Sequence, residues 1–181
     1  MSADPALRIA TIDDEAGVQA LMTESAAVLF PRYYGAQESE SAVRYVAHVD
    51  RALLEDGTYY VIEADGELIA CGGWSRRDKL YTGGEAGDDR LLDPATEPAR
   101  IRAMFVRADW TRRGLGRRIL EACEEAARAE GFTKLALGST LAGLPLYEAY
   151  GFERLEDFEV TLPDGVTVAA VSVEKPIAAL E

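Results

Sequence analysis

The chain has 181 residues, of which 48% are hydrophobic and 28% charged, a composition typical of a globular protein with a sizeable core. This length predicts one domain over residues 1–181. Acidic residues outnumber basic ones by 32 to 19, and the resulting net charge of −13 argues against nucleic acid or an anionic membrane as partner. It would suit a cationic small molecule or a basic peptide end, although an acidic surface often serves only solubility.

The chain has no apolar run long enough to span a membrane and no apolar signal core near its start. Its two cysteines, Cys71 and Cys123, lie far apart in apolar segments, and His48 is the single histidine. A disulfide framework, a zinc knuckle and a histidine-rich metal site are therefore excluded, and we expect no metal. A reducing cytoplasm is the expected location.

The first half predicts a short strand, two helices and a hairpin. The apolar residues Val18, Leu21, Met22 and Val28 recur at helical spacing after a cap at Asp13 or Asp14. The expected elements are a strand at 8–11, a helix from about 13 onward, a helix over 38–55, and strands at 58–63 and 67–74 that flank the two-residue turn at 65–66.

An insertion at 76–98 follows, rich in Gly, Asp and Pro and without periodicity. It carries six acids, among them Glu85, Asp88, Asp89, Asp93 and Glu97. Long irregular insertions are either functional lids or loose excursions. We expect a surface loop that borders the functional site.

The second half predicts a strand, a turn, a helix and another strand, followed by a short helix and a final pair of strands. We expect the strand at 100–106, the turn at 109–114, the helix at 115–130, the next strand at 132–138 and the short helix at 144–150. The last two strands flank the turn at 163–165. A strand–helix–strand unit implies a parallel pair with a right-handed crossover, and the rest reads as antiparallel. The predicted class is α/β, a single-domain, mixed and mostly antiparallel sheet with one parallel strand–helix–strand unit.

The turn before the long helix reads Arg112-Arg113-Gly114-Leu115-Gly116-Arg117. Glycines two apart let a ligand approach the backbone, and the N–H groups of a first helical turn favour an anion. Residues 100–118 hold seven arginines and one acid, a local charge of +6. We therefore expect a phosphate site, with solvated surface arginines as the alternative. A Walker loop would need a lysine here, and the dinucleotide fingerprint would need glycine at Ile119.

Three segments resemble the GNAT superfamily of GCN5-related N-acetyltransferases: Phe105-Val106, the residues 112–116 of the turn, and the run Leu146-Tyr147-Glu148-Ala149-Tyr150-Gly151-Phe152. The resemblance implies the acyl-CoA N-acyltransferase fold and acetyl-CoA as co-substrate. It assigns the coenzyme A diphosphate to Arg112, Arg113, Gly114, Leu115, Gly116 and Arg117, and the pantetheine arm to the backbone of Phe105 and Val106. The sequence departs from the family at Thr111, often Gln or Arg, and at Thr140, often Asn.

Tyr147 is the candidate catalytic residue. A phenol with a pKa of about 10 can protonate the leaving thiolate, and the family uses the tyrosine at this position in that way. The alternative is a core tyrosine with a satisfied hydroxyl. Tyr150 is expected to pack.

A general base is not assigned, because the strand at 100–106 carries no acid. Glu97 is a weak candidate, and a backbone N–H near Val106 is expected to polarise the carbonyl oxygen. His48 is expected on a solvated helix face, and both cysteines in the core.

The expected function is an N-acetyltransferase that moves an acetyl group from acetyl-CoA to a primary amine by direct attack in a ternary complex. The acceptor is a small amine or a peptide amine, including a protein N-terminus or lysine. The alternative is a CoA-binding regulatory or sensor module without turnover. The family often forms dimers, which leaves a homodimer open, and the many arginines with no asparagine favour a bacterial source.

Overall fold

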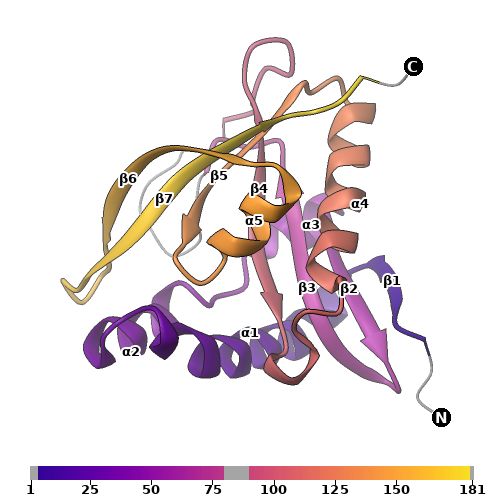
Figure 1. Ribbon diagram of the computed structural model, residues 1–181. Coiled ribbons are helices and arrows are strands. Elements are labelled where there is room, and N and C mark those ends of the chain that lie inside the picture. Colours follow the sequence, from indigo (N-terminus) through magenta and orange to yellow (C-terminus); the bar gives the residue numbers. More distant parts are fainter. Residues whose placement is uncertain (1–3, 80–89, 180–181) are drawn as a thin grey trace.

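The computed structural model describes residues 4–79 and 90–179. Within them, seven strands form one sheet in the order β1-β2-β3-β4-β5-β7-β6 (Figure 1). The strands are β1 Ala6–Ile9, β2 Tyr59–Ala64, β3 Glu67–Ser75, β4 Ala99–Val106, β5 Lys134–Thr140, β6 Glu153–Thr161 and β7 Thr167–Pro176. The helices are α1 Glu15–Leu29, α2 Ala36–Tyr45, α3 Arg51–Asp56, α4 Leu115–Ala129 and α5 Leu144–Tyr150, with 3-10 turns at Ile12–Asp14, Phe30–Arg32 and Ala108–Trp110.

Neighbouring strands of the sheet run antiparallel except β4 and β5, which are parallel and joined through α4. This arrangement confirms the predicted fold class. The expected hairpin is also present, because Asp65 and Gly66 both have positive φ, 53° and 79°, as a type I′ turn requires. No helix in the described ranges is long and apolar enough to cross a membrane.

The helix expected over 38–55 is wrong, because α2 ends at Tyr45 and α3 begins only at Arg51. Side chains satisfy the backbone in the break. The Gln19 amide donates to the Ala47 carbonyl at 2.8 Å and accepts from the Val49 N–H at 3.1 Å. Asp50 then caps α3 by accepting from the Ala52 N–H at 3.1 Å. These contacts come from another helix or from the cap itself, so the apolar periodicity did not reveal them.

The sheet packs between two hydrophobic clusters. Helix α4 buries Ile119, Leu120 and Cys123 in one cluster. Helices α1 to α3 contribute to the other, which also holds Cys71. Both cysteines are fully buried, in agreement with their predicted place in the core.

Candidate functional site

The two parallel strands separate soon after they begin. β4 and β5 pair only at Ala99–Leu135 and Arg100–Ala136, and the arrows diverge beyond that point (Figure 1). The Arg107 N–H donates to the Ile69 carbonyl of β3 at 2.9 Å. Because backbone groups alternate along an antiparallel strand, the N–H and carbonyl of Val106 face the opening instead. The opening therefore offers backbone hydrogen-bonding groups that no strand uses.

A β-bulge shapes β4 at the same place. Ala103 and Met104 together face Gly72 of β3, and Ala103 has a φ of 52°. A Cβ on Gly72 would lie 2.0 Å from the Met104 sulfur, so this position admits only glycine unless that side chain moves. The Tyr59 hydroxyl donates to the Ala103 carbonyl at 2.7 Å and holds the bulge. Bulges bend the strand that carries them, which helps to part β4 from β5.

A cavity of about 460 Å³ occupies this opening. It brings together eight of the nine residues that the sequence singled out for the site. These are Phe105, Val106, Arg112, Gly114, Leu115, Gly116, Arg117 and Tyr147. The ninth, Arg113, lies outside the cavity wall, and its guanidinium stacks over the Trp110 ring at 4.4 Å.

The mouth of the cavity includes the start of α4. The first intrahelical bond of α4 runs from the Arg118 N–H to the Gly114 carbonyl at 3.1 Å, so the N–H groups of residues 115–117 precede the helical pattern. Gly114 has a φ of 78°, a left-handed conformation that glycine adopts easily, and a Cβ at this position would meet open space. Together with the helix dipole, these N–H groups can hold an anion.

Gly116 has another role besides its place in the cavity wall. A Cβ there would lie 2.7 Å from the Leu146 Cδ2 atom of α5. The missing side chain lets α5 pack against the first turn of α4. The glycine spacing that predicted close ligand approach thus also serves helix packing.

The local charge of +6 overstates the free positive charge of the site. Four of its seven arginines pair with acids: Arg100 with Asp78 at 3.2 Å, Arg102 with Asp50 at 3.0 Å, Arg107 with both Glu67 and Asp109, and Arg117 with Glu121 at 3.2 Å. Most of these acids belong to distant segments of the chain, which a local count omits. The other three, Arg112, Arg113 and Arg118, are exposed at the turn and the start of α4.

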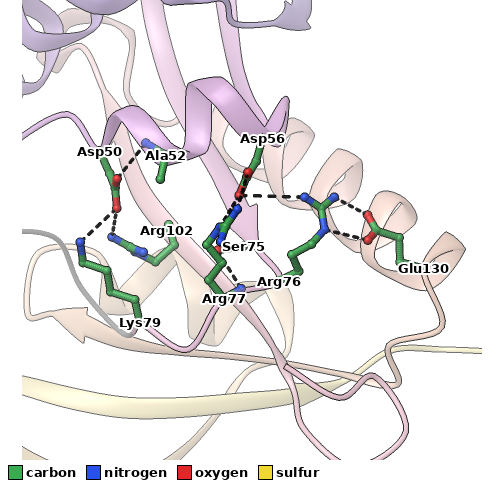
Figure 2. A network of polar contacts seen from close by, with 9 residues as sticks. All are labelled: Asp50, Ala52, Asp56, Ser75, Arg76, Arg77, Lys79, Arg102 and Glu130. Carbon is green, nitrogen blue, oxygen red and sulfur yellow. Dashed lines mark hydrogen bonds and ion pairs between the residues drawn. The ribbon is translucent and has the colours of Figure 1, made fainter. Parts of the chain in front are cut away.

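Arg102 lines the cavity and also belongs to a polar network with Asp50 and Lys79 (Figure 2). Its side chain is only 2% exposed, and Asp50 also pairs with Lys79 at 3.4 Å. Burial alone would raise the pKa of Asp50, but the positive charges of Arg102 and Lys79 outweigh it and hold that pKa below its usual value. Beside this network, Arg76 binds Glu130 and Arg77 binds Asp56. Asp50 therefore anchors a cationic side chain of the cavity wall.

Tyr147 lies in the cavity wall on α5 and is buried. Its ring packs edge-on against Phe152, with the centroids 5.6 Å apart. Burial raises the pKa of its hydroxyl well above the usual value, so the phenol keeps its proton at neutral pH. Tyr150 differs, because its hydroxyl donates to Glu124, which also accepts from Lys175 at 2.8 Å.

No Asp, Glu or His lines the cavity among residues 4–79 and 90–179. The candidate base Glu97 lies outside the cavity wall and binds Arg90 at 2.8 Å, and the hydrogen bonds from Arg90 lower its pKa to about 2. A carboxylate with that pKa is a poor base. His48 is exposed between α2 and α3. The acids Glu85, Asp88 and Asp89 of the insertion lie outside the described residues, and the described parts of the insertion do not line the cavity.

Sequence reasoning missed several residues of the cavity wall. Ser25 in α1 is 1% exposed, and its hydroxyl donates to the Val106 carbonyl at 2.6 Å. The sequence did offer one signal for Ser25, because a serine stands there at a position of the apolar stripe of the first helix. Arg32 and Tyr33, which follow α1, gave no signal, because nothing in their spacing places them near β4.

A family model described as the acetyltransferase (GNAT) family matches residues 23–152. A search of the curated proteins finds no match. Among solved structures, the chain is similar to a GCN5-related N-acetyltransferase from Rhodopseudomonas palustris, with 18% identity, a TM-score of 0.73, and coverage of 97% of this chain and 98% of that one.

Two further structures were solved with a bound ligand. The PaiA N-acetyltransferase from Thermoplasma acidophilum, in complex with coenzyme A, shares 15% identity with a TM-score of 0.66 over 96% of this chain and 99% of that one. YncA from Salmonella typhimurium, with its cofactor acetyl-CoA, shares 16% identity with a TM-score of 0.63 over 99% and 97%. At these identities the likeness concerns the fold.

Proposed function

The chain belongs to the acetyltransferase (GNAT) family, and we propose that it moves the acetyl group of acetyl-CoA to a primary amine. The observation that carries this proposal is the continuous cavity from the parted strands β4 and β5 to the start of α4. One end offers backbone groups that no neighbouring strand pairs, and the other offers an anion site. These match the amide-containing arm and the diphosphate of acetyl-CoA. The alternative is a CoA-binding sensor, which would bind acetyl-CoA without transferring its acetyl group.

The cavity wall can hold acetyl-CoA in two parts. The N–H groups of Leu115, Gly116 and Arg117, with the exposed Arg112 side chain, would bind the diphosphate. The Val106 carbonyl, which faces the opening, would accept a hydrogen bond from the pantetheine arm, and Phe105 lines the cavity beside it. Arg113 would act indirectly by stacking on Trp110, which lines the cavity.

The proposed reaction is direct transfer in a ternary complex. The amine nitrogen bonds to the acetyl carbonyl carbon while the Val106 N–H, which faces the opening, donates to the carbonyl oxygen. The carbon–sulfur bond then breaks, and the Tyr147 hydroxyl gives its proton to the leaving sulfur. The amine releases its extra proton to solvent, and Tyr147 regains one from water. The products are an N-acetyl amide and the free thiol of CoA.

Titration calorimetry with acetyl-CoA tests binding, and release of free thiol in the presence of a panel of amines tests transfer. Binding with thiol release and an acetylated amine detected by mass spectrometry supports the proposal. Binding without thiol release for every amine would favour the sensor. Failure to bind either CoA or acetyl-CoA would refute the site.

A further inference from the structure

The charged residues that line the cavity, within the described ranges, are all arginines: Arg32, Arg102, Arg112 and Arg117. This is unexpected for a chain with a net charge of −13. Arg112 and Arg117 lie at the diphosphate end. Arg32 follows α1, and Arg102 binds Asp50 at the start of α3, so these two belong to the side of the cavity formed near α1 and α3. In the described wall an acceptor amine therefore meets guanidinium groups and no carboxylate, although Asp50 lies behind Arg102 and pairs with it at 3.0 Å.

The rest of the wall on this side is mostly apolar, with contributions from Leu29, Phe30, Val46 and Ala142. A second hollow of about 50 Å³ adjoins the cavity and shares Val46, Gly138 and Thr140 with it. Phe158, Val160 and Val168 of β6 and β7 form part of its wall. The hydroxyl of Tyr34 in the same wall is engaged, since it donates to the Ala169 carbonyl at 2.7 Å and accepts from the Leu141 N–H at 2.8 Å. This hollow suits a short alkyl group.

The amine must be neutral before it can attack, because an ammonium has no lone pair. Without a carboxylate or histidine among the described residues of the wall, we infer that the proton leaves in solution, before binding. A peptide α-amine with a pKa of about 7.7–8.0 is largely neutral at mild pH, whereas an alkylamine like that of lysine, with a pKa of about 10.4, is almost fully protonated. Nearby guanidinium groups further disfavour the ammonium form.

We propose that the acceptor is a weakly basic amine beside a short apolar group, such as an α-amine of an apolar residue, and that polycations are excluded. The inference rests on the proposed N-acetyltransferase function and names the substrate class of the same site. It reverses the expectation from overall charge, which favoured a cationic partner.

The first experiment compares two acceptors that share an alkyl group. Leucinamide carries an α-amine, and isopentylamine is the corresponding alkylamine. We expect kcat/KM for leucinamide to exceed that for isopentylamine on the order of 300-fold at about pH 7, from the difference in neutral fraction. For isopentylamine, kcat/KM should rise about tenfold per pH unit up to about pH 10, whereas for leucinamide it should level off near pH 8. A plateau for isopentylamine near neutral pH would reveal an enzymic base and overturn the inference.

The second experiment changes the charge of the wall. Arg32 is exposed and makes no ion pair within the described residues, so Arg32→Glu should fold normally. It should raise kcat/KM for spermidine about threefold or more and change that for leucinamide less. Arg44→Glu is the matched control, because Arg44 is exposed on α2 and lines neither hollow. Equal effects of the two variants, or a wild-type preference for spermidine, would overturn the inference.

Failure of the proposed acceptor class can be distinguished from failure of the proposed acetyltransferase function. Thiol release with spermidine or isopentylamine in preference to leucinamide refutes the acceptor class and leaves the acetyltransferase function intact. Binding of acetyl-CoA without thiol release for any of the three amines counts against both.

Discussion

The hydroxyl of Ser25 donates a hydrogen bond of 2.6 Å to the carbonyl oxygen of Val106. It joins the buried face of α1 to the end of β4, where the backbone turns toward the cavity. The carbonyl faces the opening, so the serine occupies one of its two lone pairs and holds its direction. Ser25 is thus a positioning residue for the backbone that we assign to the pantetheine arm.

Ser25→Ala should raise KM for acetyl-CoA several-fold and leave kcat nearly unchanged. It should also lower the free energy of unfolding by about 0.5–1.5 kcal/mol, because one intramolecular hydrogen bond is lost. Steady-state kinetics and urea unfolding check both effects. Thr23→Ala is the control, since Thr23 is exposed on the same helix and its hydroxyl donates only to Gln19. Equal KM values for the two variants would remove Ser25 from the site.

Tyr147→Phe should lower kcat by about 10²–10⁴, the usual contribution of a general acid, without changing the Kd for acetyl-CoA. Tyr150→Phe is the matched control. It removes a hydroxyl that binds Glu124 and should affect stability more than turnover. Single-turnover kinetics and calorimetry separate the two effects. If both variants keep wild-type kcat, Tyr147 has only a packing role.

Gly114→Ala should weaken acetyl-CoA binding at least tenfold. The left-handed backbone costs an L-residue about 1–2 kcal/mol, and relaxation of that strain would turn the N–H groups of α4 away from the diphosphate. Gly57→Ala is the control, because Gly57 has a φ of 72°, a similar open environment and no place in the cavity wall. Both variants should lose similar stability in thermal unfolding, but only Gly114→Ala should lose affinity. Unchanged affinity would refute the proposed diphosphate site.

Asp50→Asn should destabilise the protein by about 3–5 kcal/mol at neutral pH, because the buried Arg102 guanidinium loses its charged partner. The pKa of Asp50 lies below its usual value in the folded protein. At acidic pH its carboxyl group is therefore protonated less often in the folded than in the unfolded protein. Its stabilisation is complete above the unfolded pKa of about 3.9 and is lost as pH falls through the folded pKa.

Urea unfolding at about pH 7 and at about pH 3 tests this sign, since the difference between wild type and Asp50→Asn should shrink at the lower pH. Asp109→Asn serves as control, because Asp109 is exposed and pairs only with Arg107. A difference that does not change with pH would contradict the ion pair as its source.

The arrangement of strands and helices in the second half of the chain was predictable because its signals are local. Gly114 and Gly131 bracket α4, and the apolar stripe between them has helical spacing. Asp65-Gly66 likewise determines its own turn. The first half was harder, since Gln19 and Asp50 break the expected helix through contacts that no local pattern records.

The sequence by itself determined the fold class and the place of the glycine–arginine turn at residues 112–117 before α4, because backbone conformation and helical periodicity depend on near neighbours. Its resemblance to a family and the chemistry of a phenol made Tyr147 a candidate. Only the tertiary structure decided which arginines keep free charge, that Ser25 reaches Val106, and that Glu97 belongs with Arg90 outside the cavity. Pairing of charges depends on distances across the sheet, between residues tens of positions apart. For that reason an acidic chain can enclose a cavity whose described wall carries only positive charge.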